Sequence, residues 1–299
     1  MKITPVLFGL SLAFAGTGIA IAQDSTPMKP PAVIQITREW LKPGKSGSVH
    51  DKSEAAFVAA MNKGKIQGHY IALNSMSGKS RALYIQRYDS YGAWENDNKL
   101  IDKNAALAAE LDRATLADGE LLDGLDQAVL AYVDEMSYHP RPDFSHARYY
   151  EITSFHVRPG HSREWHQVAK MYKEACEKAG MDVHWGMYQV VFGADGGTYI
   201  ALTHRDSLAE LDKEMANDKK FVEAMGGEEG MNKFDELYGQ AVDSSHSELF
   251  SINPRQSYVD EATIKADPDF WKPKAAAPKA PTAATTKPAT GTTPKPASR

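Results

Sequence analysis

The sequence predicts an α+β protein built from two tandem β-α-β-β-α-β units, the ferredoxin-like arrangement. Two observations lead to this fold class. Pro43-Gly44 and Pro159-Gly160, 116 residues apart, each follow an alternating β-branched segment and precede an amphipathic one. The elements expected after each turn then come in the same order in both copies. Because this period is too long for a solenoid repeat, the copies are predicted to be whole domains, covering residues 32–143 and 147–258.

The first 22 residues are predicted to be a cleaved signal peptide. Met1-Lys2 precedes an apolar run that ends in Ala20-Ile21-Ala22, the small-residue pattern of a cleavage site. The alternative is an uncleaved membrane anchor, for which the run is short and is broken by glycine. We therefore expect an exported protein, periplasmic or secreted, whose mature chain begins near Gln23, with residues 23–31 as a linker.

The first strand and the first helix of each copy have clear sequence patterns. Strands are expected at 33–41 and 149–157, where β-branched and aromatic residues alternate with polar ones up to the Pro-Gly turn. An amphipathic helix should follow, with apolar residues every three to four positions. Each helix is predicted to end at a glycine that supplies a left-handed C-cap, Gly64 in the first copy and Gly180 in the second.

A β-hairpin is expected next in each copy, because two alternating segments flank a turn that contains glycine. A longer helical region follows, marked in the first copy by leucines up to Leu125, and a last short strand precedes a Pro-Arg pair. We align Tyr84 with Tyr199, and Gln127 with Gln240, in these later elements. The hairpin strands are predicted at 69–74, 82–87, 184–192 and 198–203.

The second copy begins with Tyr150-Glu151-Ile152, has an aromatic residue at Phe155 and turns at Pro159-Gly160-His161 before its helix. This pattern resembles the dimeric α/β-barrel superfamily, closest to NIPSNAP-type and antibiotic-biosynthesis-monooxygenase-like domains. The first copy departs from it, with Ile34-Gln35 in place of the aromatic-Glu pair and Glu39 in place of the second aromatic. The resemblance implies that the two units pack sheet to sheet, so that a tandem chain forms an intramolecular α/β barrel. It also implies relatives that are monooxygenases or handle haem.

The predicted ligand site lies on the second strand of each copy, where alternation places an aromatic ring and a side-chain amide on one face. Polar residues of the neighbouring strand, Gln35 with Thr37 and Glu151 with Thr153, would hydrogen-bond a ligand if this face lines the barrel interior. The alternative is that these side chains only pack the interface between the sheets. A histidine begins each strand, as a ligand contact or as a capping residue. The predicted ligand-binding residues are Tyr70, Asn74, Trp185, Gln189, His69 and His184.

His156, His161 and His166 follow one another at five-residue steps across a strand end, a turn and a helix start. Three imidazoles in this pattern could converge on a metal or haem. Only His166 has a histidine counterpart in the first copy, His50, and solvent-exposed histidines near a turn are the alternative. No carboxylate pair with catalytic spacing stands out. We therefore predict no metal site and no cofactor.

Residues 272–299 are rich in Pro, Ala, Thr and Lys, without aromatic or acidic residues, which predicts a disordered tail. Its six positive charges contrast with the net charge of −5 of the whole chain. An anionic envelope surface is one candidate partner for this tail, and a solvated tether is the alternative. The acidic remainder argues against nucleic acid. The one cysteine, Cys176, excludes internal disulfides and is expected to be a buried, inert thiol.

The sequence therefore predicts an exported protein that binds a small, largely apolar molecule in a barrel pocket, with monooxygenase-like activity as an extension from the resemblance. Whether it is an enzyme stays open, since no P-loop, G-x-S-x-G or H-E-x-x-H motif occurs. The alternative is a non-enzymatic module of the cell envelope that is tethered by its basic tail. Neither hypothesis identifies the ligand.

Overall fold

The computed structural model describes residues 28–272 of the chain. The predicted signal peptide lies outside the described residues, as do most of the linker and all but the first residue of the tail. Within the described range the chain forms one eight-stranded antiparallel sheet and nine α-helices, which confirms the α+β class. No helix among these residues is long and apolar enough to cross a membrane.

The first half begins with a strand whose limits match the prediction. Its elements are β1 (Val33–Leu41), α1 (Ser48–Gly64), β2 (Tyr70–Ser75), β3 (Arg81–Tyr88), α2 (Tyr91–Lys103), α3 (Ala105–Gly119), β4 (Leu122–Tyr132) and the 3-10 turn η1 (Asp134–Met136). The left-handed cap of α1 falls on Lys65, and not on Gly64 as predicted. Gly64 is instead required by close packing, because a Cβ there would lie 2.5 Å from a methyl group of Leu107 on α3.

The second half repeats this order of elements with more helices before its last strand. Its elements are β5 (Tyr149–Val157), α4 (Ser162–Ala179), β6 (Gly186–Phe192), β7 (Thr198–Arg205), α5 (Ala209–Ala216), α6 (Asp218–Met225), α7 (Gly227–Ala241), β8 (Val242–Ile252), α8 (Glu261–Ala266) and α9 (Pro268–Trp271). Gly180 provides the predicted left-handed cap of α4. The fourth strand of each half is longer than predicted, and Leu125 belongs to β4 and not to a helix.

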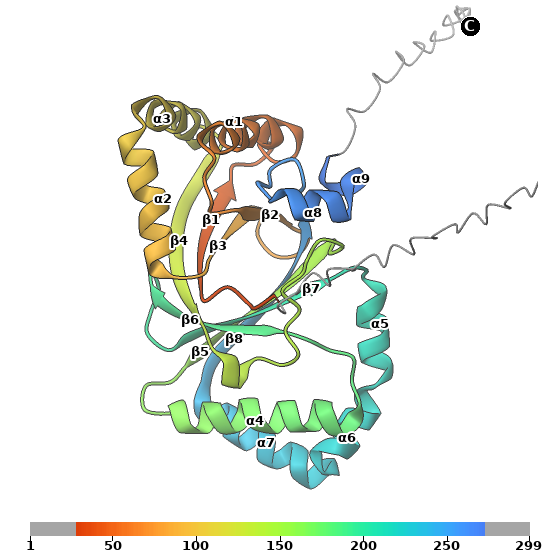
Figure 1. Cartoon of the computed structure of the whole chain (residues 1–299). Coiled ribbons are helices and arrows are strands. Elements are labelled where there is room, and N and C mark those ends of the chain that lie inside the picture. The colour runs from red at the N-terminus through yellow and green to blue at the C-terminus, as the bar shows by residue number, and fades with distance from the viewer. Residues whose placement is uncertain (1–27, 273–299) are drawn as a thin grey trace, which may run out of the picture.

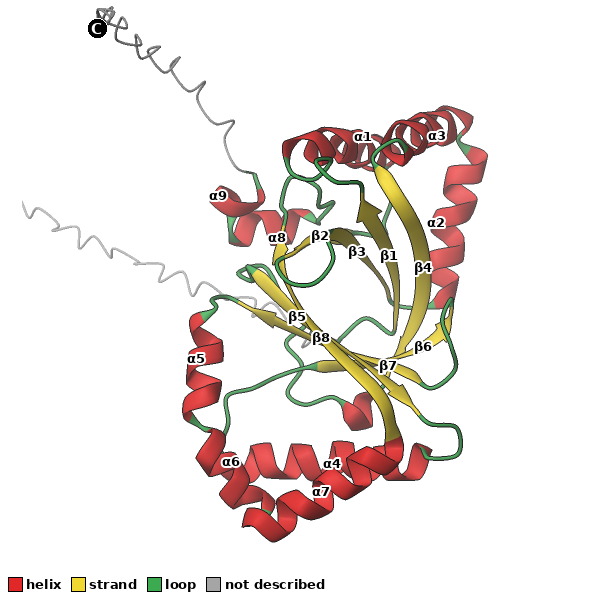
Figure 2. Cartoon of the chain, turned by 180° about the vertical axis from the view of Figure 1, so that it is seen from behind, coloured by secondary structure: helices red, strands yellow, loops and turns green. Residues whose placement is uncertain are grey.

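The strands pair in the order β1-β3-β2-β8-β5-β7-β6-β4, and the pairing of β4 with β1 closes the sheet into a barrel. In each half the first strand lies between the third and the fourth. Two seams join the halves: Leu73 of β2 pairs with Ile252 of β8, and Leu130 of β4 pairs with Val190 of β6. Helices α1 and α3 cover one side of the barrel, and α4, α6 and α7 cover the opposite side (Figures 1 and 2).

Strand register corrects the later part of the sequence alignment. The pairing shifts between Trp40 and Leu41 in β1 and between His156 and Val157 in β5, at positions 116 residues apart. In the third and fourth strands of each half the predicted alignment is wrong. The paired neighbours of Thr37 are Tyr84 and Gln127, whereas those of Thr153 are Ala201 and Ser247. Ala201 and Ser247 therefore occupy the places that were assigned to Tyr199 and Gln240.

The barrel interior is the main hydrophobic core. Alternate residues of all eight strands form one buried cluster, with members such as Ile34, Leu73, Leu130, Tyr150 and Phe250. The other face of each strand is turned to the helices, where three smaller clusters lie; the smallest packs Val33, Tyr88 and Val129 against α2. Of the other two, one joins β2 and β3 to α1 and α3, and the second joins β6 and β7 to α4 and α7. The spaces between sheet and helices are therefore separate from the interior.

Residues after β8 turn back over the first half. Tyr258 forms a bridge with Tyr70 of β2, and Gln256 reaches His50 on α1. The indole N–H of Trp271 in α9 donates to the carbonyl of Ser145. Figure 1 shows α8 and α9 beside the first half, on the same side of the barrel as α1. The end of the described chain thus completes the packing of its beginning.

Candidate functional site

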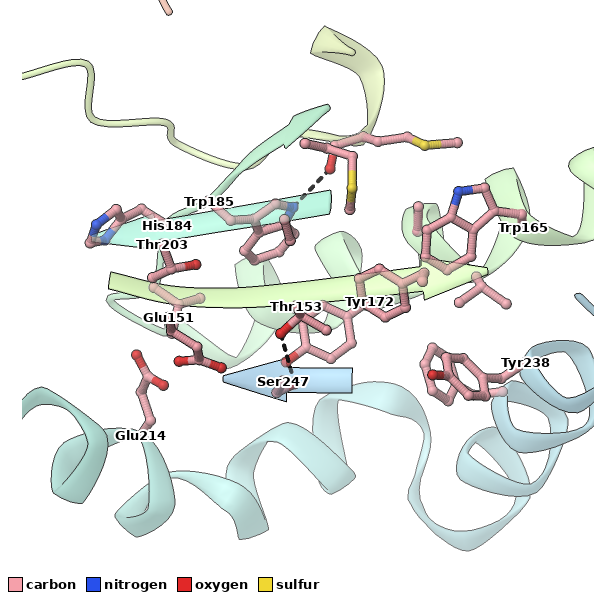
Figure 3. A pocket seen from close by; sticks show the side chains of 18 of the residues that line it. Glu151, Thr153, Trp165, Tyr172, His184, Trp185, Thr203, Glu214, Tyr238 and Ser247 are labelled. Atoms are coloured by element: carbon pink, nitrogen blue, oxygen red, sulfur yellow. Dashed lines mark hydrogen bonds between the residues drawn. The ribbon is translucent and has the colours of Figure 1, made fainter. Parts of the chain in front are cut away.

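The candidate site is a cavity of about 400 Å³ in the second half, between the outer face of the sheet and the helices α4, α5 and α7 (Figure 3). Its size and its largely apolar wall are those of a small-molecule pocket. The apolar part of the wall consists of Met136, Phe155, Trp165, Val168, Ala169, Tyr172, Val183, Trp185, Met187, Ala201, Phe234 and Tyr238. The polar part consists of Glu151, Thr153, His184, Thr203, Arg205, Glu214 and Ser247.

Two tryptophans define the aromatic wall. The indole N–H of Trp185 donates to the carbonyl of Met136 at 2.8 Å, and its ring stacks on Tyr138 with centroids 5.0 Å apart, so its orientation is fixed. Trp165 is 2% exposed, and its ring centroid lies 4.9 Å from that of Phe155. The N–H of Trp165 is buried without a hydrogen-bond partner. It is a donor that the protein leaves free at the pocket wall.

Arg205 organises the polar end of the pocket. Its side chain is only 4% exposed and donates to Glu151 at 2.6 Å and to Glu214 at 3.0 Å. Burial acts to lower the pKa of Arg205, but the hydrogen bonds that Arg205 donates to Glu214 and Glu151 outweigh burial and raise this pKa above its ordinary value. Two carboxylates therefore share one guanidinium. The polar end carries an excess of negative charge.

His184 lies beside this end of the pocket as a neutral imidazole. It is 3% exposed, and its Nε2 lies 2.7 Å from the carbonyl oxygen of His204, which can only accept. Nε2 therefore carries the proton, and Nδ1 is left as an acceptor. Burial, with smaller contributions from His204 and Arg141, lowers the pKa of His184 to about 4. The side chain thus adds no positive charge at neutral pH.

The pocket changes in character along its length. In Figure 3, Glu151, Glu214 and His184 gather at one end, and Trp165 and Tyr238 lie at the other. Between them Thr153 and Ser247 share a hydrogen bond of 2.8 Å across neighbouring strands. The arrangement can hold a molecule whose body is apolar and whose polar end donates hydrogen bonds or is positively charged.

Of the predicted residues in the second half, His184 and Trp185 line the pocket. Gln189 lies further along the same strand and is exposed, away from the pocket wall. The faces that carry these residues are turned to the helices, as the membership of Trp185 and Met187 in the helix-side cluster shows. The idea that these faces line the barrel interior is therefore wrong, because the alternate residues of the same strands fill that interior.

The predicted residues of the first half are not brought together. Tyr70 is buried and lines the space between the sheet and α1, whereas Asn74 lies at a shallow depression near Asn253. His69 is half-buried and stacks on Tyr258, with ring centroids 4.7 Å apart. Burial lowers the pKa of His69. The imidazole of His69 is therefore packed against Tyr258 and does not share a site with Asn74.

The predicted histidine trio does not assemble. His166 lies 2.9 Å from Glu135 and His161 lies 3.6 Å from Glu164, both near the surface, and within residues 28–272 the trio forms no group of potential metal ligands. A different group does form in the first half. One potential ligand atom from each of its members lies within 4.8 Å of the others. The group contains three carboxylates that their spacing in the sequence did not single out. Its members are Glu39, His50, Glu54 and Asp118.

Arg205 and the four-residue group were missed in the sequence. Arg205 and Glu214 belong to different elements, β7 and α5, and their contact depends on the turn between them. For the group, two clues were present. Glu39 takes the place of the aromatic residue Phe155 of the second copy, and His50 and Glu54 have the i, i+4 spacing that places them on one face of a helix.

No family model matches the chain, and no curated protein matches it. Three solved structures show the range of similarity. A candidate monooxygenase from Fusobacterium nucleatum subsp. nucleatum is 12% identical, with a TM-score of 0.48 and coverage of 75% of this chain and 94% of that chain. A chlorite dismutase variant from Candidatus Nitrospira defluvii is 10% identical, with a TM-score of 0.46 and coverage of 79% and 96%. A haem-binding protein from Thermus thermophilus is 11% identical, with a TM-score of 0.43 and coverage of 79% and 96%.

Proposed function

We propose that the protein binds a small amphipathic molecule in the pocket of the second half, with an aromatic or otherwise apolar body and one cationic or hydrogen-bond-donating end. One observation carries this proposal: an aromatic cavity ends at two carboxylates that share a single buried guanidinium. A pocket with a few fixed polar groups on an apolar wall is the usual form of a small-molecule site.

The charges at the polar end favour donors over acceptors. Both terminal nitrogens of Arg205 already donate to Glu214 and Glu151, and its Nε–H is buried, so a ligand carboxylate would meet two like charges and a guanidinium with no accessible donor. An ammonium or hydroxyl group would find carboxylate oxygens and, at neutral pH, the acceptor Nδ1 of His184. The fixed ring of Trp185 would stack on the ligand body.

The proposal is tested with three probes that share one body: 1-naphthylmethylamine, 1-naphthol and 1-naphthoic acid. Isothermal titration calorimetry on the mature protein should give the tightest binding for the amine and the weakest for the acid. Trp185→Ala should weaken binding of the amine at least about tenfold, the loss of one well-packed aromatic contact. Gln189→Ala is the matched control on the same strand and should bind as the wild type does.

Preferred binding of 1-naphthoic acid, or equal affinities of the Trp185→Ala and Gln189→Ala variants, would contradict the proposal. The monooxygenase-like reaction stays a prediction from the sequence resemblance. Oxygen consumption during incubation with 1-naphthol tests it separately. Consumption that Trp185→Ala abolishes would support an enzyme, whereas binding without consumption would leave a binding protein.

We also propose that the two halves are ferredoxin-like units joined in tandem. The same strand order in each half and the register shifts 116 residues apart support this. Co-expression of residues 28–143 and 144–272 as separate chains tests it. Recovery of a folded complex with pocket affinity for the amine supports two units, whereas aggregation of both chains counts against them.

Export and envelope retention are proposed from the sequence alone. The basic tail is the candidate tether to an anionic surface. The mass of the exported protein tests cleavage before Gln23. Deletion of residues 273–299 tests retention: a loss from the envelope fraction with unchanged pocket affinity supports the tether, and unchanged fractionation removes it.

A further inference from the structure

We propose that the first half binds a divalent metal ion through Glu39, His50, Glu54 and Asp118. The four side chains come from three elements, β1, α1 and α3, which converge on the side of the sheet that faces the helices. Their exposed fractions are 6%, 0%, 3% and 2%, and one ligand atom from each lies within 4.8 Å of all the others. This proposal does not depend on the ligand pocket of the second half.

The charges of the group are unbalanced. Nε2 of His50 lies 3.2 Å from Glu39, 3.5 Å from Asp118 and 3.7 Å from Glu54. Within the described residues none of these three carboxylates forms a salt bridge with a lysine or an arginine. Three buried acids thus face at most one positive charge. Buried charge without compensation is strongly unfavourable, and a divalent cation would supply the compensation.

Several polar atoms of the group lack partners. The Oε1 atom of Glu54 and the Oδ1 atom of Asp118 are buried without a hydrogen bond, although both lie near Nε2 of His50. The hydroxyl group of Tyr70 is also buried without a partner, and it lines the same cavity as the three acids. The hydroxyl group of Tyr84 lies close enough to Glu54 and Glu39 to interact with both carboxylates. Buried polar atoms are satisfied in most native structures, and a bound cation would satisfy the free carboxylate oxygens.

Protonation is the other way to neutralise the acids. Burial, followed by the charges of Glu39 and Asp118, raises the pKa of Glu54 to about 9, and burial is also the main reason that the pKa of Glu39 is raised. A metal would displace the proton from Glu54, because only the carboxylate is a ligand. The two alternatives therefore differ in a measurable way: metal binding should release protons.

The surroundings of His50 fit a metal ligand. Its Nδ1 lies 3.2 Å from the side-chain amide of Gln256, which is fully buried and whose Oε1 has no partner. Coordination through Nε2 requires the proton on Nδ1. In its other amide orientation Gln256 accepts a hydrogen bond from Nδ1–H through Oε1, at the loss of the hydrogen bond that its Nε2 now donates to Asp51 at 3.1 Å; such a partner is the usual outer-shell support of a metal-bound histidine.

The cavity provides access to the proposed ion. The three acids line a space of about 560 Å³, whereas His50 does not, so the ion would have imidazole on its protein side and open space on the other. Three carboxylates with one imidazole combine ligands that suit Mn²⁺ with one that suits Fe²⁺ and Zn²⁺. The predicted ion is therefore a first-row divalent metal, and an open position would admit water or a small anion.

The experiment titrates MnCl₂ into the EDTA-treated, dialysed mature protein by calorimetry, with electron paramagnetic resonance on the same samples. One Mn²⁺ per chain is expected, with proton release and with nitrogen coupling from one imidazole. Glu54→Gln should weaken binding at least about 100-fold, since loss of an outer-shell partner alone costs 10- to 100-fold. His166→Gln, which changes an exposed histidine of α4, should bind Mn²⁺ as the wild type does.

His50→Gln keeps the proposal testable if Glu54→Gln fails to fold, because it should remove the nitrogen coupling as well as affinity. Absence of stoichiometric Mn²⁺ binding would overturn the proposal. So would bound Mn²⁺ without nitrogen coupling, or binding that His166→Gln abolishes and Glu54→Gln leaves intact. ZnCl₂ in parallel distinguishes a preference for oxygen-rich coordination from one for nitrogen, and the same variants apply.

Discussion

The two spaces between sheet and helices occupy corresponding places in the two halves, yet they differ in chemistry. The position of Glu39 corresponds to Phe155 at an offset of 116, and Tyr70 corresponds to Trp185 on the strand that follows. Both spaces have polar and aromatic residues in their walls, but the first contains acids without a basic residue, whereas the second contains two tryptophans and pairs its acids with Arg205. The comparison teaches that one backbone arrangement can support two kinds of site, because the side chains decide the chemistry.

The two halves also treat buried carboxylates differently. In the second half Glu151 and Glu214 are both paired with Arg205, and both are partly exposed. In the first half Glu39, Glu54 and Asp118 meet only His50. The second arrangement is complete without any other molecule, whereas the first requires protons or a cation. The predictions below either remove this difference or make it larger.

The largest effect is expected from Arg205→Met, which would leave the second half with unbalanced acids like those of the first. Loss of one partner of a buried ion pair costs 3–5 kcal/mol, and the partial exposure of both glutamates reduces this to about 3 kcal/mol in the free energy of unfolding. Urea denaturation at pH 7 measures it. Arg141→Met is the control, since Arg141 forms an exposed pair with Asp182 and should change stability by less than about 1 kcal/mol.

Adding Glu151→Gln and Glu214→Gln to Arg205→Met should recover much of the lost stability, because both glutamates would then be replaced by neutral amides. Equal destabilisation by Arg205→Met and by Arg141→Met would mean that the carboxylates at the pocket are solvated. The two halves would then not differ in the way described.

The next effect, which is smaller for each single pH unit, concerns Glu54 in the metal-free protein. Its pKa rises from 4.5 to about 9 on folding, so the stability from its protonated form is full below pH 4.5 and is lost as the pH rises through 9. The free energy of unfolding should fall by up to about 1.4 kcal/mol per pH unit across this window. The titratable groups that face Glu54 are Glu39, His50, Asp118, Tyr70 and Tyr84.

Urea denaturation with EDTA at pH 6, 7.5 and 9 tests this slope. Glu54→Gln should flatten it, because the amide does not titrate. If the wild type and the variant lose stability in parallel, Glu54 is not the group that holds the proton. Saturating Mn²⁺ should remove the slope in the wild type, since the ion replaces the proton.

The smallest effect has the opposite sign and comes from His184 in the second half. Its pKa falls to about 4 on folding, so its contribution to stability is full above pH 6.5 and is lost as the pH falls towards 4. The expected loss in the free energy of unfolding is up to about 1.4 kcal/mol per pH unit below pH 6.5. The titratable and charged groups that face His184 are His204, Arg141 and Arg205. Denaturation at pH 6.5 and 5 of the wild type and of His184→Gln measures the loss. A loss unchanged in the variant would assign the effect to another group.

Local pattern predicted the first strands of both halves well. β1 and β5 have the expected limits because alternation is interrupted by a Pro-Gly turn, a signal that depends only on neighbouring residues. Leucine spacing failed near Leu125, where β4 continues the barrel, since leucine occurs in helices and in strands. The alignment of Tyr84 failed within the hairpin, before any added helix, and that of Gln127 failed because the second half has an added helix, α7, before β8. Pairing partners decided these elements, and pairing is not local.

The sites were predictable only in part. Strand alternation identified the face that carries Trp185, but the face turned to the helices could not be distinguished from the interior one, because both are buried. Glu39 was visible as a departure from the aromatic residue that the second copy has at Phe155. Its meaning depends on Asp118, which α3 brings to it from a distant part of the chain. Single residues on one strand can be selected from sequence, whereas groups assembled from several elements require the fold.

The return of the chain over its first half has a consequence for synthesis. Gln256 and His50 are 206 residues apart, and β2 acquires its second neighbour only when β8 is available. During translation the first half therefore emerges with an unpaired strand edge and with His50 still lacking its contact with Gln256. Contacts of such long range slow folding, and unpaired edges promote aggregation. The residues that are made first should be among the last to become protected from hydrogen exchange.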